Sequence, residues 1–318
     1  MSGYLVTGGA GFIGSHIAEA LVRRGDRVTI LDNLSTGSRS NFAEFADGVE
    51  FIEGDVSDTA AVERALEGVE YVFHQAALAS VPRSVERPLD THAACVTGTA
   101  VLLDASRRMG VRRVVFAGSS SAYGDQPHAS KRETDLPAPL SPYAAAKLAA
   151  EMYCSAFYHT YGLETITIRY FNVFGPRQDP DSPYSAVIPL FITAILSGRS
   201  PTVYGDGRQS RDFTFVENVV HGNLLAMGCD STEALGTCIN VANGQSTTLL
   251  TLIDALAELL GTKVEPVFAP ARVGDVRESL ADITRARELL AYEPIVSFRD
   301  GLQRSVAYYQ SLAAPGRG

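Results

Sequence analysis

The sequence has few of the residues that would indicate a metal centre or a disulfide framework. Only four cysteines occur among its 318 residues, and no two of them form a Cys-x-x-Cys pair. The six histidines show no spacing typical of metal ligands. We therefore expect no metal, and we expect Cys95, Cys154, Cys229 and Cys238 to be ordinary reduced thiols.

Basic charge and long apolar runs are also scarce. The formal net charge is -9 and the isoelectric point is near 5.2, so the broad basic face that nucleic acid or an anionic membrane would require is not expected. Nowhere do about 18 uncharged apolar residues follow one another. No basic and apolar leader precedes the strand-like run that begins at Tyr4. We expect a cytoplasmic protein that binds neither nucleic acid nor membrane.

The composition that remains is that of a globular protein. Hydrophobic residues make up 46% of the chain and charged residues 20%, which excludes disorder and fibrous structure. A chain of 318 residues can form one large or two ordinary domains and can bury a substantial core.

Strand-like and helix-like segments alternate through the first half of the chain. The predicted strands are residues 4–7, 28–31, 49–52, 71–74, 114–117 and 165–170. Helical patterns include residues 58–66, 88–108 and the segment after Ser141. This alternation predicts an α/β fold with a doubly wound parallel sheet of the Rossmann type.

A glycine-rich turn joins the first strand to the first helix. Gly8, Gly11 and Gly14 let the backbone turn tightly and approach a pyrophosphate at the helix N-terminus. Asp32 ends the second strand at the offset of a ribose-binding acid and would repel a 2'-phosphate, so we expect NAD, although Arg39 lies nearby. The expected cofactor contacts are Gly8, Gly11, Phe12, Ile13, Gly14, Asp32, Asn33, Asp55, Val56, Gln75, Ala76, Ala77, Tyr143 and Lys147.

A tyrosine and a lysine lie four residues apart at the start of a predicted helix. Ser141 can cap this helix and Pro142 suits its first position, so Tyr143 and Lys147 share one face. The lysine cation and an oxidised nicotinamide would favour the phenolate by lowering the pKa of the tyrosine.

Three serines follow the strand at 114–117, and Ser119 is the first of them. Together with Tyr143 and Lys147 it forms a set that can move a hydride and a proton. Ser119 would hydrogen-bond a substrate hydroxyl, Tyr143 would exchange its proton, and Lys147 would bind the nicotinamide ribose. We expect His74 to be a packed residue at a strand end.

The pattern becomes less regular after Asn172, where we place the start of a second, ligand-covering domain. A hairpin with an Asp-Gly turn is predicted at residues 203–208. Residues 213–216, a helix to residue 227 and residues 238–241 are expected to rejoin the first sheet. Further helices are predicted at residues 249–260, 284–290 and 298–312.

These motifs resemble those of the extended short-chain dehydrogenases/reductases, and among them the bacterial UDP-hexose and UDP-N-acetylhexosamine 4-epimerases are most similar. The resemblance covers nearly the whole chain. The motifs that carry it are residues 7–14, 32–34, 54–56, 74–77, 119–124, 169–176, 205–207, 211–213 and 274–276, together with Tyr143 and Lys147. It implies an NAD-binding Rossmann domain of residues 1–171, rejoined by about 213–243, and a smaller α/β UDP-sugar-binding domain of residues 172–212 and 244–318.

The resemblance also implies a mechanism and a set of substrate contacts. Hydride leaves C4 of the sugar for tightly held NAD, the 4-keto sugar swings about its pyrophosphate, and hydride returns to the opposite face. Asn172 would contact the nucleotide-sugar phosphates, Tyr204 the uracil, and Arg211 and Arg272 the pyrophosphate. Further implied contacts are Ala79, Ser119, Ser120, Ser121, Gln178, Ala186, Val187, Asp275 and Ser279.

The nature of the sugar depends, in the family, on the position occupied here by Ser279. Epimerases restricted to non-acetylated sugars carry a tyrosine there, whereas a serine leaves room for an N-acetyl group. We therefore expect UDP-GlcNAc and UDP-GalNAc as substrates, with UDP-Glc and UDP-Gal as a second pair. Two residues depart from the family pattern: Cys95 replaces a common asparagine, and Ala79 replaces a glycine of the close relatives.

Three other functions are alternatives to a UDP-hexose or UDP-N-acetylhexosamine 4-epimerase. A 4,6-dehydratase is disfavoured, because Ser120 and Ser121 stand where those enzymes have an Asp-Glu pair. A UDP-glucuronate 4-epimerase or decarboxylase is the nearer alternative. A non-catalytic NAD-binding sensor or scaffold would predict a damaged Ser/Tyr/Lys set, and this one is intact. The family further implies a homodimer that pairs the helices at residues 88–108 and 141–161.

Overall fold

The computed structural model describes residues 2–128, 130–180, 186–271 and 277–313, and its main feature is a seven-stranded sheet. The strand order is β12-β7-β5-β4-β1-β2-β3, and every pairing is parallel. The strands are β1 (Gly3–Thr7), β2 (Arg27–Asp32), β3 (Val49–Glu53), β4 (Tyr71–His74), β5 (Arg113–Ser119), β7 (Glu164–Tyr170) and β12 (Thr237–Val241). The predicted doubly wound Rossmann fold is thus confirmed, and all six strands predicted in the first half of the chain are present.

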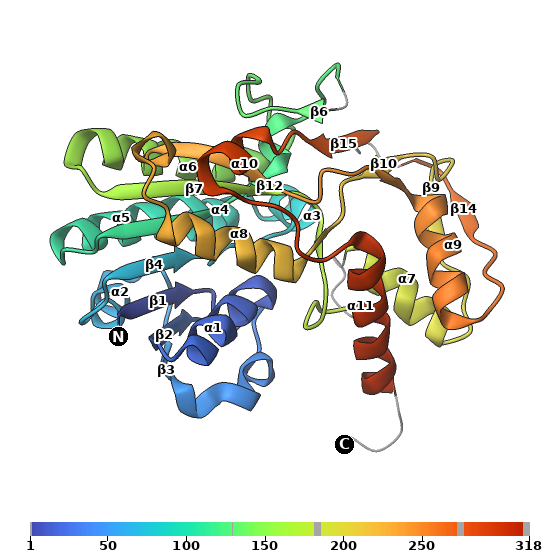
Figure 1. Cartoon of the computed structure of the whole chain (residues 1–318), viewed down its shortest axis with the longest axis horizontal. Helices are drawn as coiled ribbons and strands as arrows, with labels where there is room; N and C mark the ends of the chain where they lie inside the picture. The colour runs from blue at the N-terminus through green and yellow to red at the C-terminus, as the bar shows by residue number, and fades with distance from the viewer. Residues whose placement is uncertain (1, 129, 181–185, 272–276, 314–318) are drawn as a thin grey trace.

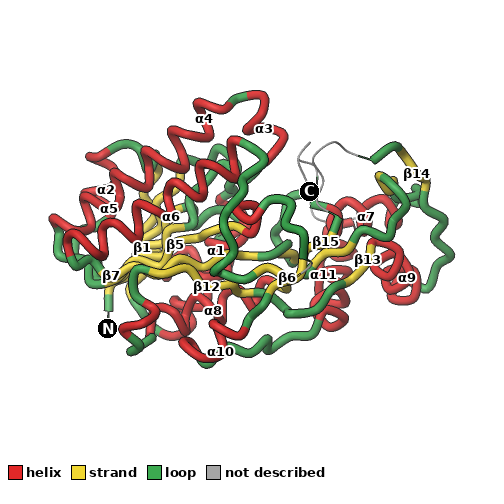
Figure 2. Tube along the Cα trace, turned by 90° about the horizontal axis from the view of Figure 1, so that it is seen from above, coloured by secondary structure: helices red, strands yellow, loops and turns green. Residues whose placement is uncertain are grey.

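Helices cover both faces of this sheet, because successive side chains of a strand point to opposite faces. Val6 packs with Ile17 of α1 (Phe12–Arg24) on one face, whereas Leu5 packs with Leu102 of α5 (Gly98–Arg108) on the other. Figure 2 shows the strands between α5 and α6 on one side and α8 and α10 on the other. The remaining helices of these two layers are α2 (Thr59–Ala65), α6 (Pro142–Tyr161), α8 (Val216–Gly228) and α10 (Thr284–Leu290).

The helix predicted at residues 88–108 is interrupted. It consists of α4 (Pro88–His92), a widened π turn at Ala93–Thr97, and α5. A short helix, α3 (Val81–Glu86), precedes it and was not predicted. Gly98 follows the π turn, and a Cβ there would lie 2.5 Å from the Val56 side chain, so the turn packs closely on the segment after β3.

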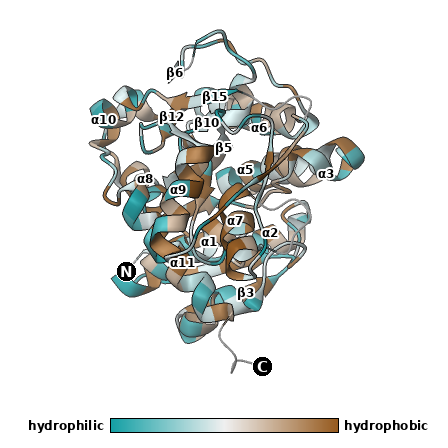
Figure 3. Cartoon of the chain, turned by 90° about the vertical axis from the view of Figure 1, so that its right-hand side faces the viewer, coloured by the Kyte–Doolittle hydropathy of each residue, from teal (hydrophilic) through white to brown (hydrophobic). Residues whose placement is uncertain are grey.

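The second part of the chain has its own core, made by α7, α9 and α11 around small sheets (Figure 1). Figure 3 shows hydrophobic and hydrophilic residues alternating along α9 and α11, as expected for helices with one buried face. The helices are α7 (Val187–Leu196), α9 (Leu249–Leu260) and α11 (Phe298–Ala313). The short strands are β6 (Ser130–Lys131), β8 (Val173–Phe174), β9 (Thr202–Tyr204), β10 (Ser210–Arg211), β11 (Thr214–Phe215), β13 (Thr247–Thr248), β14 (Val267–Ala269) and β15 (Glu278–Ala281).

The predicted hairpin at residues 203–208 is wrong. β9 pairs in parallel with β14, and β10 pairs instead with β13 and β15. Gly205 and Gly207 both have positive φ, 84° and 75°, but the chain leaves this turn in a different direction. The Gly205 amide continues the ladder to Ala269, whereas the Gly207 carbonyl accepts from the Leu250 amide. β9 and β10, which the Asp-Gly sequence would pair with each other in a hairpin, therefore pair with strands from later in the chain instead.

Of the segments expected to rejoin the large sheet, only residues 238–241 do so, as β12. The expectation for residues 213–216 is wrong, because β11 pairs with β8 in a separate two-stranded sheet. The helix that follows, α8, nevertheless packs Val219 and Ala226 against the first core. α10, from the last part of the chain, packs Ala286 and Leu290 in the same core.

Four single turns of helix complete the described secondary structure. They are η1 (Arg39–Asn41), η2 (Ala43–Gly48), η4 (Ser120–Tyr123) and η5 (Thr232–Ala234). Across the described ranges, no helix is both long and apolar enough to cross a membrane.

Two histidines, fully buried His74 and partly buried His16, make the stability of the fold depend on pH. Burial lowers the pKa of His16 to about 4 and, together with the Lys147 charge, lowers that of His74 to about 3. Both pKa values lie below the unfolded value of about 6.5, so between these limits the unfolded state binds more protons and acidification favours unfolding. We expect each histidine to remove up to ~1.4 kcal/mol of stability per pH unit below about pH 6.

Denaturant unfolding of His16→Gln between about pH 6 and pH 5 tests this expectation. The slope of the unfolding free energy against pH should be shallower than in the wild type by the contribution of one histidine. His159→Gln, at an exposed position, is the control and should keep the wild-type slope. An unchanged slope in His16→Gln would contradict the assignment.

Candidate active site

The structure brings Ser119, Tyr143 and Lys147 together where β5 and α6 meet. The Ser141 hydroxyl accepts from the Ala144 amide at 3.2 Å and caps α6, and Pro142 begins the helix, as predicted. The Tyr143 side chain is hydrogen-bonded to Ser119. Ser119 Oγ lies 2.8 Å from the oxygen of a second loop hydroxyl, that of Ser121.

Lys147 is only 3% exposed, and its Nζ lies 4.5 Å from the centre of the Phe116 ring. Burial lowers the pKa of this lysine. Burial also raises the pKa of Tyr143, and the nearby Cys95 adds to this effect, whereas the hydrogen bond with Ser119 opposes it. The predicted lowering of the pKa of Tyr143 is therefore not seen in the protein alone. The expectation included the positive charge of an oxidised nicotinamide, which acts only in the cofactor complex.

The glycine turn is packed so closely that larger residues do not fit. Gly8 has φ +67°, and a Cβ there would lie 2.7 Å from the Ala76 amide nitrogen. A Cβ on Gly14 would lie 2.2 Å from the Gly8 carbonyl oxygen. Gly11 is the N-cap of α1 and offers no side-chain acceptor, while Phe12 and Ile13 form the first turn. The backbone N–H groups of this turn can therefore bind an anion, as a dinucleotide pyrophosphate requires.

A cleft of about 300 Å³ lies at the carboxyl ends of β1, β2, β3 and β4, beside the glycine turn. It has the position and lining expected for a dinucleotide in a doubly wound sheet. The predicted residues that line it are Gly8, Asp32, Asn33, Asp55, Val56, Ala76 and Ala77. Residues that the sequence did not indicate also line it, among them Ser35, Thr36, Arg83, Asp90, Ala93 and Ala94.

Asp32 is held in this cleft by two backbone amides. Its carboxylate accepts from Ala10 at 3.0 Å and from Leu34 at 2.8 Å, although burial raises its pKa. Arg39, the residue that could have favoured a 2'-phosphate, donates to Glu53 at 2.9 Å. The acidic residue thus faces the cleft while the basic one is paired, which fits NAD.

Other predicted cofactor residues have structural partners. Asn33 donates to Asp55 at 2.7 Å, and this pair shapes the rim of the cleft. The Gln75 amide donates to the Tyr170 hydroxyl at 3.1 Å, and that hydroxyl also contacts Asn223. Gln75 therefore belongs to a polar network behind the cleft.

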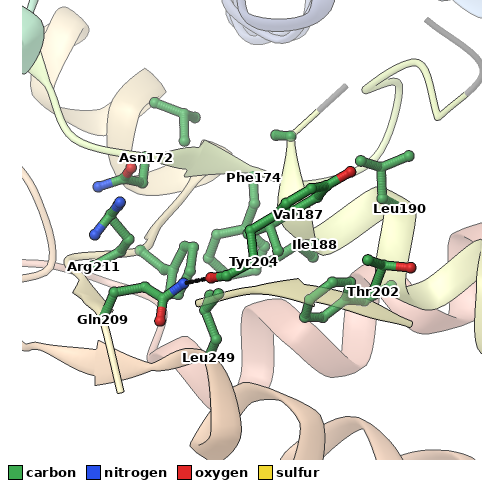
Figure 4. A pocket seen from close by; sticks show the side chains of 14 residues that line it. Asn172, Phe174, Val187, Ile188, Leu190, Thr202, Tyr204, Gln209, Arg211 and Leu249 are labelled. Atoms are coloured by element: carbon green, nitrogen blue, oxygen red, sulfur yellow. Dashed lines mark hydrogen bonds between the residues drawn. The ribbon is translucent and has the colours of Figure 1, made fainter. Parts of the chain in front are cut away.

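A second cleft of about 300 Å³ opens between α7, β9 and β10 (Figure 4). Five predicted substrate residues line it: Asn172, Ala186, Val187, Tyr204 and Arg211. In Figure 4 the polar ends of Asn172 and Arg211 lie near each other at one side. The other side is apolar and includes Phe174, Ile188, Leu190, Phe191 and Leu249, with Val173, Thr202, Gln209 and Phe213 completing the lining. One polar end and an apolar slot beside a tyrosine suit a phosphorylated ligand with a flat base.

Among the described residues, the other predicted substrate contacts do not belong to the lining of either cleft. Ser120 and Ser121 form the turn η4 directly after Ser119. Ser279 lies on β15 and pairs in register with Arg211 of the second cleft. Ala79 is exposed before α3. Arg272 and Asp275 lie outside the described residues.

Gln178 lies beside β8 and donates to the Val173 carbonyl at 3.3 Å. Its Oε1 is buried and has no hydrogen-bond partner within the described part of the chain. Such an unsatisfied acceptor is consistent with a ligand contact. Among the described residues, no group of three or more His, Cys, Asp or Glu side chains could hold a metal ion.

Gln209, Arg83 and Asp90 are among the polar lining residues that sequence reasoning missed. Gln209 follows the glycines of the incorrectly predicted hairpin, and its side chain donates to the Tyr204 carbonyl. Arg83 and Asp90 belong to the short helices α3 and α4, which show no clear periodicity. The Ser80 cap, three positions before Arg83, was the available signal for α3.

Comparison with known proteins agrees with this arrangement. A UDP-glucose 4-epimerase of Mycolicibacterium smegmatis is 39% identical over 311 residues, which cover 96% of this chain and 98% of that protein. A UDP-glucuronate 4-epimerase of Thermodesulfobacterium geofontis is 33% identical over 317 residues, covering 96% and 95%. The solved structure of a UDP-N-acetylglucosamine 4-epimerase from Methanobrevibacter ruminantium M1, in complex with UDP-N-acetylmuramic acid, has a TM-score of 0.93 and 40% identity, covering 98% and 99%.

The family described as "NAD dependent epimerase/dehydratase family" matches residues 4–242, which include the glycine turn, both clefts' polar residues from Asp32 to Arg211, and the Ser119, Tyr143 and Lys147 set. NAD is the cofactor, as the family description and the NAD-bound structures of similar epimerases indicate. By sequence and by structure, the chain belongs to the NAD-dependent epimerase/dehydratase family of extended short-chain dehydrogenases/reductases.

Proposed function

We propose that this chain is a UDP-sugar 4-epimerase that interconverts UDP-GlcNAc and UDP-GalNAc and also accepts UDP-Glc and UDP-Gal. The observation that carries the proposal is the placement of Ser119, at the end of β5, beside Tyr143 of α6, with buried Lys147 one helical turn away. The site occurs in a fold that has one cleft for NAD and a second for a nucleotide sugar. In this proposal residues 1–171 and about 213–243 hold NAD, and residues 172–212 and 244–318, apart from α10, hold the UDP-sugar.

The chain's own residues supply acid-base chemistry and positioning. Ser119 hydrogen-bonds the 4-hydroxyl of the sugar, and Tyr143 takes the proton of that hydroxyl and later returns it. The Lys147 cation binds the nicotinamide ribose and stabilises the phenolate. Asn172 and Arg211 hold the nucleotide phosphates while the sugar turns. NAD, when bound at the glycine turn and Asp32, supplies a reversible hydride acceptor.

The choice of sugar rests on Ser279. Ser279 pairs in register with Arg211, a residue that lines the second cleft, across the β10–β15 pairing. In this proposal, a side chain as short as serine leaves space for a substituent on the sugar. The known relatives act on UDP-glucose, UDP-GlcNAc and UDP-glucuronate, so the sugar needs a direct assay.

The purified protein should be incubated, without added cofactor, with UDP-GlcNAc, UDP-Glc and UDP-GlcA in turn, and each product resolved from its C4 epimer. We expect conversion of UDP-GlcNAc to UDP-GalNAc, with slower conversion of UDP-Glc. Turnover of UDP-GlcA alone would instead make the chain a UDP-glucuronate 4-epimerase, and release of carbon dioxide would make it a decarboxylase. No turnover of any UDP-sugar with NAD supplied would overturn the proposal in favour of a non-catalytic NAD-binding protein.

We also propose that the chain forms a homodimer through α3, α4 and α6. These helices pack on one another and expose large apolar side chains to solvent. The exposed fractions are 44% for Val81, 65% for Val85, 81% for Leu89 and 51% for Met152. Several such side chains on neighbouring helices form a patch that a second copy would cover.

Replacement of Leu89 by arginine is expected to convert the dimer to a monomer, because it places a charge in the apolar contact. Light scattering coupled to size-exclusion chromatography measures the change. Leu136→Arg is the control, since Leu136 is 85% exposed in the loop after β6 and should leave the dimer intact. A wild-type protein that is monomeric at micromolar concentration would refute the interface.

A further inference from the structure

A continuous series of hydrogen bonds runs through the buried interior between β1, β4 and the π turn. The Ala76 amide lies 3.3 Å from Thr7 Oγ1, which lies 2.7 Å from His74 Nδ1. His74 Nε2 lies 2.9 Å from Thr99 Oγ1, which lies 2.6 Å from the Cys95 carbonyl oxygen. We call this series the Thr7–His74–Thr99 relay. All three of its side chains are fully buried.

Each bond of the relay has only one consistent direction. The Cys95 carbonyl can only accept, so Thr99 donates to it and must accept from His74 Nε2–H. His74 Nδ1 is then the unprotonated nitrogen and accepts from the Thr7 hydroxyl, whose oxygen in turn accepts from the Ala76 amide. These directions hold for neutral His74, which then carries its proton on Nε2. Burial and the Lys147 charge agree, because they lower the pKa of His74 to about 3.

Both ends of the relay lie at the lining of the cofactor cleft. Ala76, where the relay begins, lines the cleft after β4. Cys95, where it ends, lies in the π turn directly after Ala93 and Ala94, which also line the cleft. The relay therefore connects two segments of the chain that line the cleft.

The π turn also packs against the helix that carries the catalytic pair. Cys95 is 1% exposed and lies in an apolar cluster with Ala146, the residue before Lys147. Burial raises the pKa of Tyr143 and lowers that of Lys147; the Cys95 thiol adds to the first shift and opposes the second, so it lies close enough to couple with each. A shift of the π turn would therefore move the wall of the cleft and the surroundings of the proton-transfer residues together.

Resting on the proposed function, we propose that His74 and Thr99 are positioning residues that hold the π turn against both NAD and the Tyr143–Lys147 pair. A threonine hydroxyl often bonds the carbonyl four residues earlier in a helix, so the bond to Cys95 by itself would be ordinary. Thr99 differs because the same hydroxyl is also fixed by His74. That second bond connects α5 to the carboxyl end of β4, next to the residues that line the cofactor cleft.

The charged and titratable groups around the relay are limited in number among the described residues. Lys147 of α6 faces His74, and the Phe116 ring of β5 lies 5.4 Å from the imidazole. Cys95 and Cys154 act on Lys147. Removal of the Thr99 hydroxyl changes none of these charges, so a change in function would report the position of the π turn.

The test compares Thr99→Val, which keeps the shape and removes both bonds, with Thr99→Ser, which keeps the hydroxyl. For Thr99→Val we expect about tenfold weaker retention of NAD and about tenfold lower kcat, the effect of losing ~1.4 kcal/mol, with an unchanged KM for the UDP-sugar. Thr99→Ser should stay within about twofold of the wild type in both. Thr97→Val, at an exposed position of the same turn, is the matched control.

NAD retention is measured as the dinucleotide released on denaturation, so this reading does not depend on which sugar is converted, or on whether any is. Equal loss in Thr99→Val and Thr99→Ser, or wild-type NAD retention and kcat in Thr99→Val, would overturn the proposal. If Thr99→Val does not fold, nitrogen NMR of the wild-type imidazole decides instead. The relay requires the Nε2–H tautomer of His74, without titration down to about pH 5, and the opposite tautomer would exclude it.

Discussion

Tyr143→Phe is expected to lose roughly 10³-fold in kcat while it still holds NAD. Phenylalanine keeps the ring in its place at the start of α6 but has no hydroxyl to exchange a proton with the sugar. The cleft beside the glycine turn is lined by residues of other elements, from Gly8 to Ala94, so we expect NAD to remain bound even though Tyr143 is among the predicted cofactor contacts. The measurement is kcat with the preferred UDP-sugar, together with the NAD released on denaturation.

Tyr153→Phe is the matched control for this variant. Tyr153 lies on the same helix but is 44% exposed, so the loss of its hydroxyl should leave both kcat and NAD content at wild-type levels. Turnover near that of the wild type in Tyr143→Phe would remove Tyr143 from the role of acid and base. A protein without NAD would instead show that the phenol is needed to hold the cofactor.

The pH dependence of kcat reports the pKa of Tyr143 in the complex with its cofactor and substrate. In the protein alone, burial raises the pKa of Tyr143, whereas catalysis near neutral pH requires the phenolate to be accessible. The nicotinamide charge and Lys147 must therefore offset the effect of burial once the cofactor is bound.

The large sheet could be predicted because its signals are local. Short apolar runs such as 28–31 and 165–170 become strands wherever they are buried on both faces, and glycines fix the turn before α1. Asp32 and the Tyr143–Lys147 pair could be placed because the offset along one strand or one helical turn fixes their positions. These residues depend little on the rest of the fold.

The features that the sequence did not predict correctly depend on contacts with residues far away in the chain. The Asp-Gly sequence at 206–207 favours a hairpin, but β14 and β13, from more than 35 residues later in the chain, pair with the two arms. The break at Ala93–Thr97 has no proline or glycine within it, so helical periodicity continues through it. The Thr7–His74–Thr99 relay joins residues 67 and 25 positions apart, and no local pattern connects them.

Ser279→Tyr is expected to abolish activity on the N-acetylated sugar selectively. Ser279 is partly buried on β15 opposite Arg211, and the Ser279 carbonyl accepts from the Asp212 amide at 2.6 Å. The backbone at this position is therefore fixed, so a larger side chain has to be accommodated by the side chains around it; under the proposed function, it would take space from the sugar. We expect kcat/KM for UDP-GlcNAc to fall about 100-fold, or ~2.7 kcal/mol, while that for UDP-Glc changes by less than about threefold.

The control for this variant is Ser279→Ala, which removes the hydroxyl without adding volume and should keep both activities. If the tyrosine variant lost UDP-Glc and UDP-GlcNAc activity equally, it would have disturbed the β10–β15 pairing and the adjacent Asp212. Asp212 accepts from the amides of Asn243, Gly244 and Ala281, so damage there would lower the unfolding temperature as well. Unchanged selectivity in a stable Ser279→Tyr protein would show that another residue limits the size of the sugar, because the tyrosine would then lie outside the space that the N-acetyl group occupies.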